Sequence, residues 1–264
     1  ETVLKEGYNH HFGDWLGIDA PAGSYTGSTR TELIAQAFLA YDLELLAKAY
    51  EVLGRDGSRY RVLHEEAKNK FHADFSDEYR TQTEHVLALY FGLAENPAKT
   101  AKGLADLIHE SGDHLTTGFV GTPFLLHALS DNGYTELAYT LLLQTSYPSW
   151  LFSVSLGATT MWEHWDGINE NGDVWSKDMN SFNHYAYGAV GDWIYGKACG
   201  IQIPEDGAGF AKVRVAPMPD KRIGSLFASI DTCHGTVSSK WYHKDGKTRY
   251  EITVPVQAEL VIDG

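Results

Sequence analysis

The chain has 264 residues, of which 43% are hydrophobic, and it carries a net charge of −14 at pH 7. This acidic balance excludes a nucleic-acid-binding protein that relies on a basic face, and the longest apolar runs fall short of the roughly 18 residues of a membrane-spanning helix. No nucleic-acid or membrane partner is therefore expected. Cys199 and Cys233 are far apart and in no ligand spacing, so the sequence predicts neither a disulfide framework nor a zinc site.

The spacing of apolar residues over the first 200 positions predicts an array of helices. Residues 1–28 lack periodicity and are interpreted as a loop, whereas Thr29-Arg30-Thr31-Glu32 has the capping-box pattern that begins a helix, which Gly54 ends. Apolar residues recur at three- and four-residue spacing in five further segments, at 57–73, 79–92, 98–110, 122–130 and 134–144. One more helix is predicted over 183–198. The segments share no repeated motif, so a solenoid is not predicted.

After Gly200 the pattern changes to short strands. Residues alternate in polarity at 213–215 and 240–242, and Lys244-Asp245-Gly246-Lys247 predicts a hairpin turn into a strand at 249–254. The sequence is therefore divided into a helical domain at residues 1–200 and a small β domain at residues 201–264.

Residues 160–175, TMWEHWDGINENGDVW, combine three tryptophans with four carboxylates. Glu163 lies between Trp162 and Trp165, and a carboxylate that loses hydration in this way is typical of the acid and base groups of glycosidases. From the residue types alone, however, an acidic loop that its tryptophans anchor to the core is the commoner interpretation.

Two other clusters place aromatic and polar side chains together. The first pairs Asp14 with Trp15, which would offer a sugar a carboxylate and a flat apolar face, with an aromatic staple that closes the loop as the structural alternative. In the second, Ser181 or Asn183 is predicted to cap the following helix, which puts His184 in its first turn. A histidine at such a place is more often a structural hydrogen-bonding group than a catalyst.

Metal and nucleotide sites fit the sequence poorly. Asp166, Glu170 and Asp173 offer oxygen ligands for Ca²⁺, but their spacing departs from the helix-loop-helix calcium pattern. The glycine-rich turn at 117–123 lacks the lysine of a phosphate-binding loop. No metal and no cofactor is therefore expected.

Six motifs, in their order along the chain, resemble those of bacterial family 78 α-L-rhamnosidases. They are HFGDWL at 11–16, TTGFVGTP at 116–123, LSDNGY at 129–134, YPSW at 147–150, GATTMWEHWD at 157–166 and SFNHYA at 181–186. The resemblance covers essentially the whole chain, and the segment at 157–166 is highly specific.

The resemblance implies an (α/α)6 barrel, with the active site in its mouth, followed by a small antiparallel β-sandwich. It also implies a hydrolase that releases terminal α-L-rhamnose from a glycoside or oligosaccharide with inversion, through two carboxyl groups about 6.5–9.5 Å apart that admit a water. Glu163 matches the general base of this family. Trp15 and His184 match residues that line the rhamnose pocket, and Trp162 and Asp14 are expected to border the sugar.

The chain also departs from the family pattern. The family's general acid lies in an acidic, arginine-rich segment that ends in Trp-x-Gly-Asp upstream of Gly13, and the 12 residues before Gly13 lack this pattern. About seven helices are predicted where twelve would close the barrel. The sequence is therefore expected to be the C-terminal portion of an enzyme, with an incomplete barrel and without the acid. His164 stands where the family often has arginine.

Exposed apolar faces on such an open array predict self-association. Two alternatives to the enzyme interpretation remain at this point: a non-catalytic carbohydrate-binding remnant that keeps Trp15, Glu163 and His184, and an interaction fragment that completes its barrel with an N-terminal partner. The sequence leaves the aglycone and the cellular location open.

Overall fold

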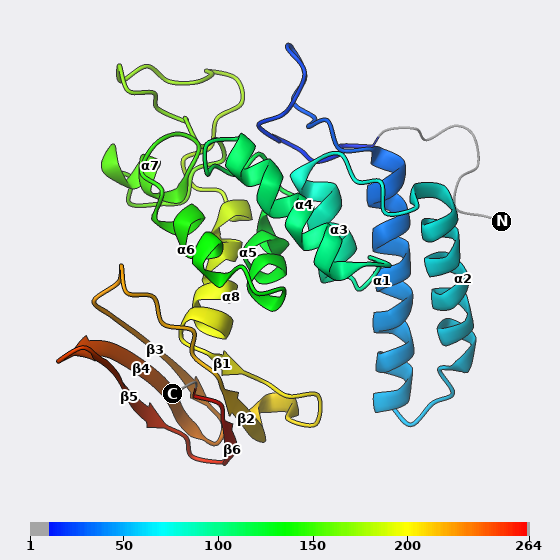
Figure 1. Ribbon diagram of the computed structural model, residues 1–264, viewed down its shortest axis with the longest axis vertical. Helices are drawn as coiled ribbons and strands as arrows, with labels where there is room; N and C mark the ends of the chain where they lie inside the picture. The colour runs from blue at the N-terminus through cyan, green and yellow to red at the C-terminus, as the bar shows by residue number, and fades with distance from the viewer. Residues whose placement is uncertain (1–10, 263–264) are drawn as a thin grey trace. The chain divides into compact units, whose positions relative to one another are not determined.

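The computed structural model describes residues 11–262, and residues 1–10 and 263–264 of the two expected domains lie outside the described part (Figure 1). The chain forms two compact units that divide between Tyr187 and Gly188. Within the described residues, none of the helices is both long enough and apolar enough to cross a membrane.

The first unit is a set of helical hairpins. Its helices are α1 (Thr31–Val52), α2 (Ser58–Phe75), α3 (Gln82–Tyr90), α4 (Pro97–Glu110), α5 (Thr122–Asp131), α6 (Thr135–Leu143) and α7 (Trp150–Ser155). Consecutive helices pack as the pairs α1–α2, α3–α4 and α5–α6, joined by short connections, as Figure 1 shows most clearly for α1 and α2. This arrangement confirms the predicted helical array.

The core of these hairpins follows from the apolar spacing of the sequence. On α1, Leu33, Ala37 and Ala40 recur at three- and four-residue spacing and are fully buried. They pack in one cluster with Phe71 of α2 and Leu87 of α3. Burial of one such large side chain contributes about 1.5–3 kcal/mol, so this cluster holds the first three helices together.

The predicted capping box at the start of α1 is wrong. Arg30 is the N-cap and makes no side-chain capping bond, while the Thr29 hydroxyl hydrogen-bonds Thr81 Oγ1 at 2.8 Å. Arg30 instead forms a bidentate ion pair with Glu84 of α3, with both nitrogen–oxygen distances 2.8 Å and the Glu84 side chain fully buried. Tertiary pairing between α1 and α3 therefore takes the place of the local cap.

The predicted helix at 183–198 is shorter and less regular than expected. The segment begins as a 3₁₀ turn, η1 (Ala186–Ala189), continues as α8 (Val190–Trp193) and ends in the π-helical η2 (Ile194–Ala198). Residues 183–185 lie outside it.

The second unit continues into two three-stranded sheets. Their strands are β1 (Ile201–Gln202), β2 (Lys212–Val215), β3 (Ser225–Thr232), β4 (Gly235–Lys244), β5 (Lys247–Thr253) and β6 (Gln257–Leu260), with a 3₁₀ turn, η3 (Ala208–Phe210), before β2. One sheet has the order β1-β2-β6 and the other β3-β4-β5. A buried cluster with residues from both sheets includes Val213 and Val215 on one and Ala228 and Val237 on the other.

The predicted hairpin between β4 and β5 is confirmed. Lys244 lies opposite Lys247, and Asp245 and Gly246 have φ values of 53° and 72°. Two left-handed central residues are what an Asp-Gly hairpin turn requires. The pairing of β2 with β6 is parallel, so the unit is not antiparallel throughout as expected.

Candidate active site

Glu163 is held beside the 181–184 segment by main-chain hydrogen bonds. The Glu163 N–H donates to the Ser181 carbonyl at 2.8 Å, and the His184 N–H donates to the Met161 carbonyl at 2.9 Å. The Ser181 N–H in turn donates to Glu163 Oε2 at 2.9 Å. This short ladder brings a carboxylate and a histidine that are 21 positions apart into one half-buried strip.

The hydrogen bonds of Glu163 leave one carboxylate oxygen available. Oε2 is fixed by Ser181, whereas Oε1 accepts no hydrogen bond from residues 11–262. A carboxylate with one oxygen anchored and the other unengaged keeps its orientation and can still take a proton from a water. This is the geometry that a general base needs.

His184 is oriented by stacking and by its own backbone. Its ring stacks on Phe119 at 4.9 Å between centroids and on Tyr185 at 5.1 Å. Its Nδ1 accepts a hydrogen bond from the Ala186 N–H at 3.3 Å, so in the neutral ring Nε2 carries the proton. Nε2 is then a donor suited to a sugar hydroxyl.

The predicted cap of the helix after His184 is wrong. The Ser181 hydroxyl accepts from the Asn183 N–H, and neither residue caps a helix. His184 itself precedes the 3₁₀ turn η1, and its ring accepts a hydrogen bond from the Ala186 N–H at the start of that turn. The predicted position of His184 inside the first turn is corrected accordingly.

Trp15 belongs to a row of aromatic rings that joins two distant parts of the sequence. Its half-buried indole contacts Phe12 at 5.7 Å and Tyr25 at 5.5 Å, and Tyr25 contacts Trp175 at 5.9 Å. Tyr25 and Trp175 are 46% and 37% exposed, so the row presents apolar ring surface to solvent. Aromatic faces of this kind pack against the C–H faces of sugars.

Asp14 lies behind this row and does not reach the surface. Its carboxylate accepts hydrogen bonds from Thr83 Oγ1 at 2.5 Å and from the N–H groups of Gly118, Val120 and Gly121 at 2.8, 2.8 and 3.3 Å. Burial raises the pKa of Asp14, and these four bonds oppose the shift. The expectation that Asp14 borders the sugar is therefore replaced by a positioning role.

The loop that Asp14 holds joins Trp15 to Phe119. The Phe119 N–H donates to the Trp15 carbonyl at 2.9 Å, and Phe119 is the ring on which His184 stacks. A Cβ on Gly118 would lie 2.3 Å from that same carbonyl, so only glycine fits this close approach. Asp14 thus fastens the backbone of Trp15 to the support of His184.

Trp162 is buried rather than exposed to a ligand. Its ring is 6% exposed and meets Phe182 edge-on at 5.4 Å. Within the described residues Trp162 therefore packs against Phe182 of the 181–184 strip, and its expected sugar contact stays a prediction.

His164, at the position where arginine was expected from the family pattern, is buried and stacks on Trp175 at 3.7 Å. Burial lowers the pKa of His164, and the charge of Glu163 opposes this shift only in part. The ring is therefore neutral at pH 7, and the site lacks the positive charge that an arginine would place next to Glu163.

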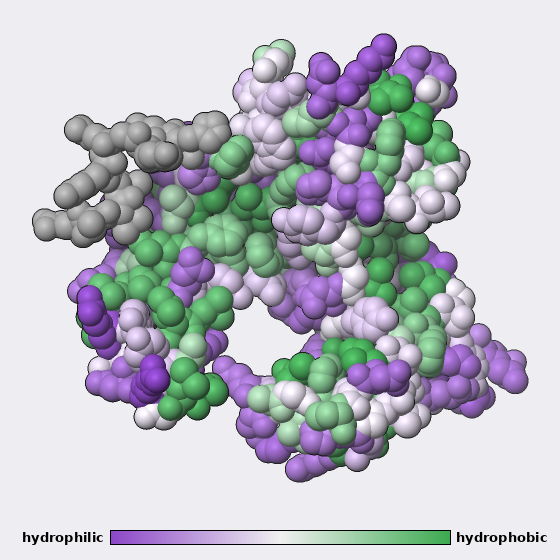
Figure 2. Space-filling view, turned by 180° about the vertical axis from the view of Figure 1, so that it is seen from behind, coloured by the Kyte–Doolittle hydropathy of each residue, from purple (hydrophilic) through white to green (hydrophobic). Residues whose placement is uncertain are grey.

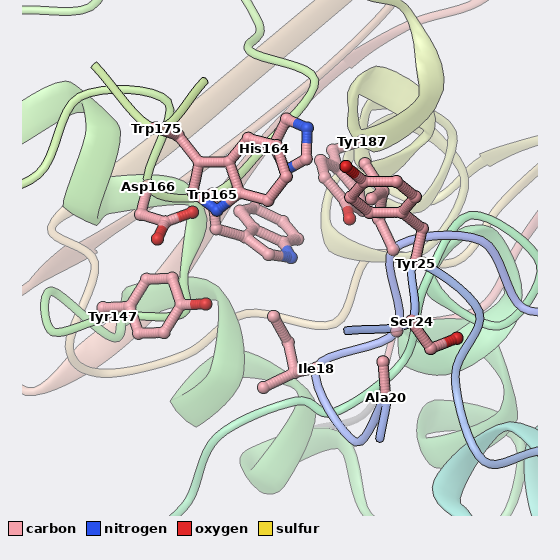
Figure 3. Close-up of a pocket in the computed structure, with 12 residues that line it drawn as sticks. Ile18, Ala20, Ser24, Tyr25, Tyr147, His164, Trp165, Asp166, Trp175 and Tyr187 are labelled. Carbon is pink, nitrogen blue, oxygen red and sulfur yellow. The ribbon is translucent and has the colours of Figure 1, made fainter. Parts of the chain in front are cut away.

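Sequence reasoning missed three further aromatic side chains of this region. Phe119 supports His184, and Tyr147 and Tyr187 line a cavity beside Trp165 and Asp166 (Figure 3). Phe119 and Tyr147 lie in motifs that were recognised, but their roles depend on contacts made in three dimensions. Within residues 11–262, no group of three or more His, Cys, Asp or Glu side chains is placed to hold a metal ion.

Two family models match the chain. The bacterial alpha-L-rhamnosidase 6 hairpin glycosidase domain matches residues 1–198, and the bacterial alpha-L-rhamnosidase C-terminal domain matches residues 200–263. Curated α-L-rhamnosidases from Formosa agariphila and Streptomyces avermitilis are 37% and 36% identical over 100% and 92% of this chain. The chain spans only 30% and 24% of the length of these relatives.

Solved structures give the same assignment. The α-L-rhamnosidase of Streptomyces avermitilis, crystallised with L-rhamnose, matches 95% of this chain with a TM-score of 0.86 and 35% identity. The α-L-rhamnosidase of Aspergillus terreus matches 96% with a TM-score of 0.88 and 31% identity. This chain covers 24% and 31% of those two chains. It therefore belongs to the bacterial α-L-rhamnosidase family, whose six-hairpin glycosidase and C-terminal domains both match it.

Proposed function

We propose that this chain supplies the base half of an inverting α-L-rhamnosidase site. Glu163 is the general base, Trp15 packs against the sugar ring and His184 donates to a sugar hydroxyl. The observation that carries this proposal is the fixed Oε2 and unengaged Oε1 of Glu163, on a strip that also bears His184. The catalytic part corresponds to residues 1–200 and the β-sandwich part to residues 201–264.

The substrate is a glycoside or oligosaccharide with terminal α-L-rhamnose. Support comes from the Streptomyces avermitilis relative, whose structure was obtained with L-rhamnose. The family's acid motif, an arginine-rich segment ending in Trp-x-Gly-Asp, is not in this sequence. We therefore expect the chain by itself to bind rhamnose but not to hydrolyse its glycosides.

The Trp15→Ala variant is expected to bind L-rhamnose about tenfold more weakly, because it removes the apolar face against which the sugar packs. Isothermal titration of L-rhamnose into the chain measures this change. The Trp15→Phe variant keeps part of the aromatic surface, so its affinity for L-rhamnose should lie between those of the unaltered chain and Trp15→Ala. Equal affinity in all three proteins would remove Trp15 from the sugar site.

Self-association is the second property that we propose for the isolated chain. Large hydrophobic side chains are exposed along the α1–α2 hairpin, and Figure 2 shows hydrophobic surface there among hydrophilic residues. They include Leu39, Leu45, Leu46 and Val52 on α1 and Val62 on α2, which are between 41% and 86% exposed. Exposed apolar side chains of this kind favour association.

Sedimentation velocity over a range of concentrations is expected to show a growing fraction of dimer or larger species. The Leu45→Lys/Leu46→Lys variant, which replaces two of these exposed leucines by charged residues, should shift the chain toward monomer. A monomer at every concentration for the unaltered chain would contradict the expectation.

A further inference from the structure

The second unit differs in charge from the rest of the chain. Residues 201–264 contain eight basic and eight acidic residues, so the whole net charge of −14 belongs to residues 1–200. Within residues 11–262, half of these basic side chains pair with a carboxylate: Lys212 with Asp206, Arg214 with Glu259, Arg222 with Asp220 and Lys240 with Glu251. The others form no ion pair in that range, and they are Lys221, Lys244, Lys247 and Arg249.

Three of the unpaired cations share one face of the hairpin that β4 and β5 form (Figure 1). Lys244 and Lys247 are directly opposite each other, and Arg249 is opposite Tyr242 two positions further along. Opposite residues of an antiparallel ladder point to the same face, and so do residues two apart on one strand. Like charges directly opposite each other destabilise a sheet, so the fold itself gains nothing from this arrangement.

Lys221 belongs to the same end of the sheet. The His243 N–H donates to the Gly224 carbonyl at 3.1 Å, and His243 Nε2 donates to the Asp220 carbonyl at 3.1 Å, so the 220–224 segment lies against the end of β4. Among the described residues of this end, the one carboxylate without an ion pair is Asp245 in the turn. The four unpaired cations, which we call the basic end, therefore outnumber the negative charge beside them.

Aromatic rings and hydroxyl groups continue the same face beyond the basic end. Lys240 Nζ lies 5.1 Å from the centroid of the Tyr242 ring, and Phe227, which is opposite Lys240, is 62% exposed. Ser229 and Ser238 are opposite each other in the following row. Exposed rings pack against the C–H faces of sugars, and hydroxyl groups bond to their polar edges. The face therefore combines unpaired cations at one end with groups that suit sugars along its length.

We propose that this face of the β3-β4-β5 sheet binds an acidic polysaccharide, with carboxylate groups of the polymer on the basic end and a sugar ring on Phe227. An arginine such as Arg249 bonds a carboxylate through two parallel N–H groups, and lysines add positive charge. Lys247 and Arg249 are two residues apart on a strand, or about 7 Å, so they suit a polymer with repeated charges better than one small anion. The choice of a glycan rests on the proposed function, whereas the charge of the face does not.

Two other polyanions fit the basic end less well. An anionic membrane surface is bound by cations that stand beside apolar side chains, whereas the turn at the tip of this hairpin is Asp245-Gly246. Tight binding of a nucleic acid takes many phosphate contacts, and four cations supply few. The acidic remainder of the chain opposes a polysaccharide only weakly, because exposed charges more than about 8–10 Å apart are largely screened at physiological salt.

Affinity electrophoresis of the chain in gels that contain polygalacturonate tests the inference. Fully methyl-esterified polygalacturonate is the comparison polymer, because it keeps the sugar chain and lacks the charge. We expect polygalacturonate to retard the chain much more than its ester does, and the retardation to weaken as NaCl is raised. The Lys244→Gln/Lys247→Gln variant should bind polygalacturonate about tenfold more weakly, while its melting temperature stays equal or rises because the like-charge pair is gone.

A second double variant controls for total charge. Lys99→Gln/Lys102→Gln removes two exposed lysines of α4 and changes the net charge by the same amount, so its affinity for polygalacturonate should equal that of the unaltered chain. The Phe227→Ala variant should bind about threefold more weakly, because it removes the ring on which a sugar lies.

Three results would overturn the inference: no retardation by polygalacturonate, equal retardation by its ester, or an equal loss of affinity in the two lysine variants. Co-sedimentation of the chain with phosphatidylglycerol vesicles, without retardation by polygalacturonate, would instead make the basic end a membrane contact. None of these results bears on Glu163, whose test is the hydrolysis of a rhamnoside. Failure of the inference is therefore distinguishable from failure of the proposed function.

Discussion

The Glu163→Gln variant is expected to lower kcat by about 10²- to 10⁴-fold in a complete α-L-rhamnosidase polypeptide that contains this sequence. Glutamine has the size and shape of glutamate but cannot take a proton from the attacking water. This loss corresponds to about 3–5 kcal/mol of transition-state stabilisation. Because the change acts on the chemical step, KM should change far less than kcat.

The fold should survive this substitution. The amide oxygen of glutamine can still accept the Ser181 N–H that now bonds Glu163 Oε2, so the strip with His184 stays in place. Glu170→Gln is the matched control, since Glu170 is an exposed carboxylate of the same acidic segment. Steady-state hydrolysis of p-nitrophenyl α-L-rhamnoside measures both variants. Equal kcat for Glu163→Gln and the parent enzyme would rule out Glu163 as the base.

The Arg30→Met variant is expected to lower the free energy of unfolding by about 3–5 kcal/mol, because it leaves the buried Glu84 carboxylate without its ion-pair partner. Glu84 accepts two side-chain bonds and one backbone bond from Arg30, and a further bond from the Arg80 N–H at 2.7 Å. Chemical denaturation at pH 7 measures the loss. The Arg61→Met variant, whose bidentate pair with Glu51 is exposed, is the matched control and should change little.

The effect of Arg30→Met should depend on pH. Burial by itself would raise the pKa of Glu84. The hydrogen bonds from Arg30 outweigh this effect, so the pKa of Glu84 lies below its ordinary value. A lowered pKa stabilises the fold above the unfolded-state value of about 4.3, and this stabilisation is lost as pH falls toward and below it. The difference between the parent chain and Arg30→Met should therefore shrink in acid, and an equal difference at pH 7 and pH 3 would contradict this origin.

The Arg30–Glu84 pair also helps to position the candidate active site. Glu84 is next to Thr83, whose hydroxyl donates a hydrogen bond to Asp14. The Arg30–Glu84 ion pair therefore holds the start of α3 in the position from which Thr83 bonds Asp14. The buried carboxylates of Asp14 and Glu84 thus connect the start of α1, the Trp15 loop and the support of His184. Both carboxylates are buried, and both fix other residues in place.

The sequence predicted those elements whose signals are local. Helices α1 to α6 were predicted because their apolar residues repeat over nine or more positions, and the β4–β5 hairpin because Asp245-Gly246 favours one turn type. Helix α7 has six residues and is too short to show a period. Strands β3 and β6 are mostly half-exposed or exposed, so their alternation is weak.

For the site residues, too, the sequence predicted what a local motif carries and not what depends on distant contacts. Glu163, Trp15 and His184 were predicted by resemblance to family motifs and remain proposals, whereas the burial of Asp14 and Trp162 could not be predicted. Asp14 bonds the backbone of residues more than 100 positions away, and no local pattern encodes that contact.

The central claim is that this chain holds the base half of a rhamnosidase site. The most direct test is nitrophenol release from p-nitrophenyl α-L-rhamnoside by the 264-residue chain and its Glu163→Gln variant, with L-rhamnose binding measured in parallel. The account predicts no turnover by either protein, together with saturable rhamnose binding by the unaltered chain. Clear turnover by the chain that Glu163→Gln abolishes would show that a competent acid lies within these residues and would contradict the half-site account.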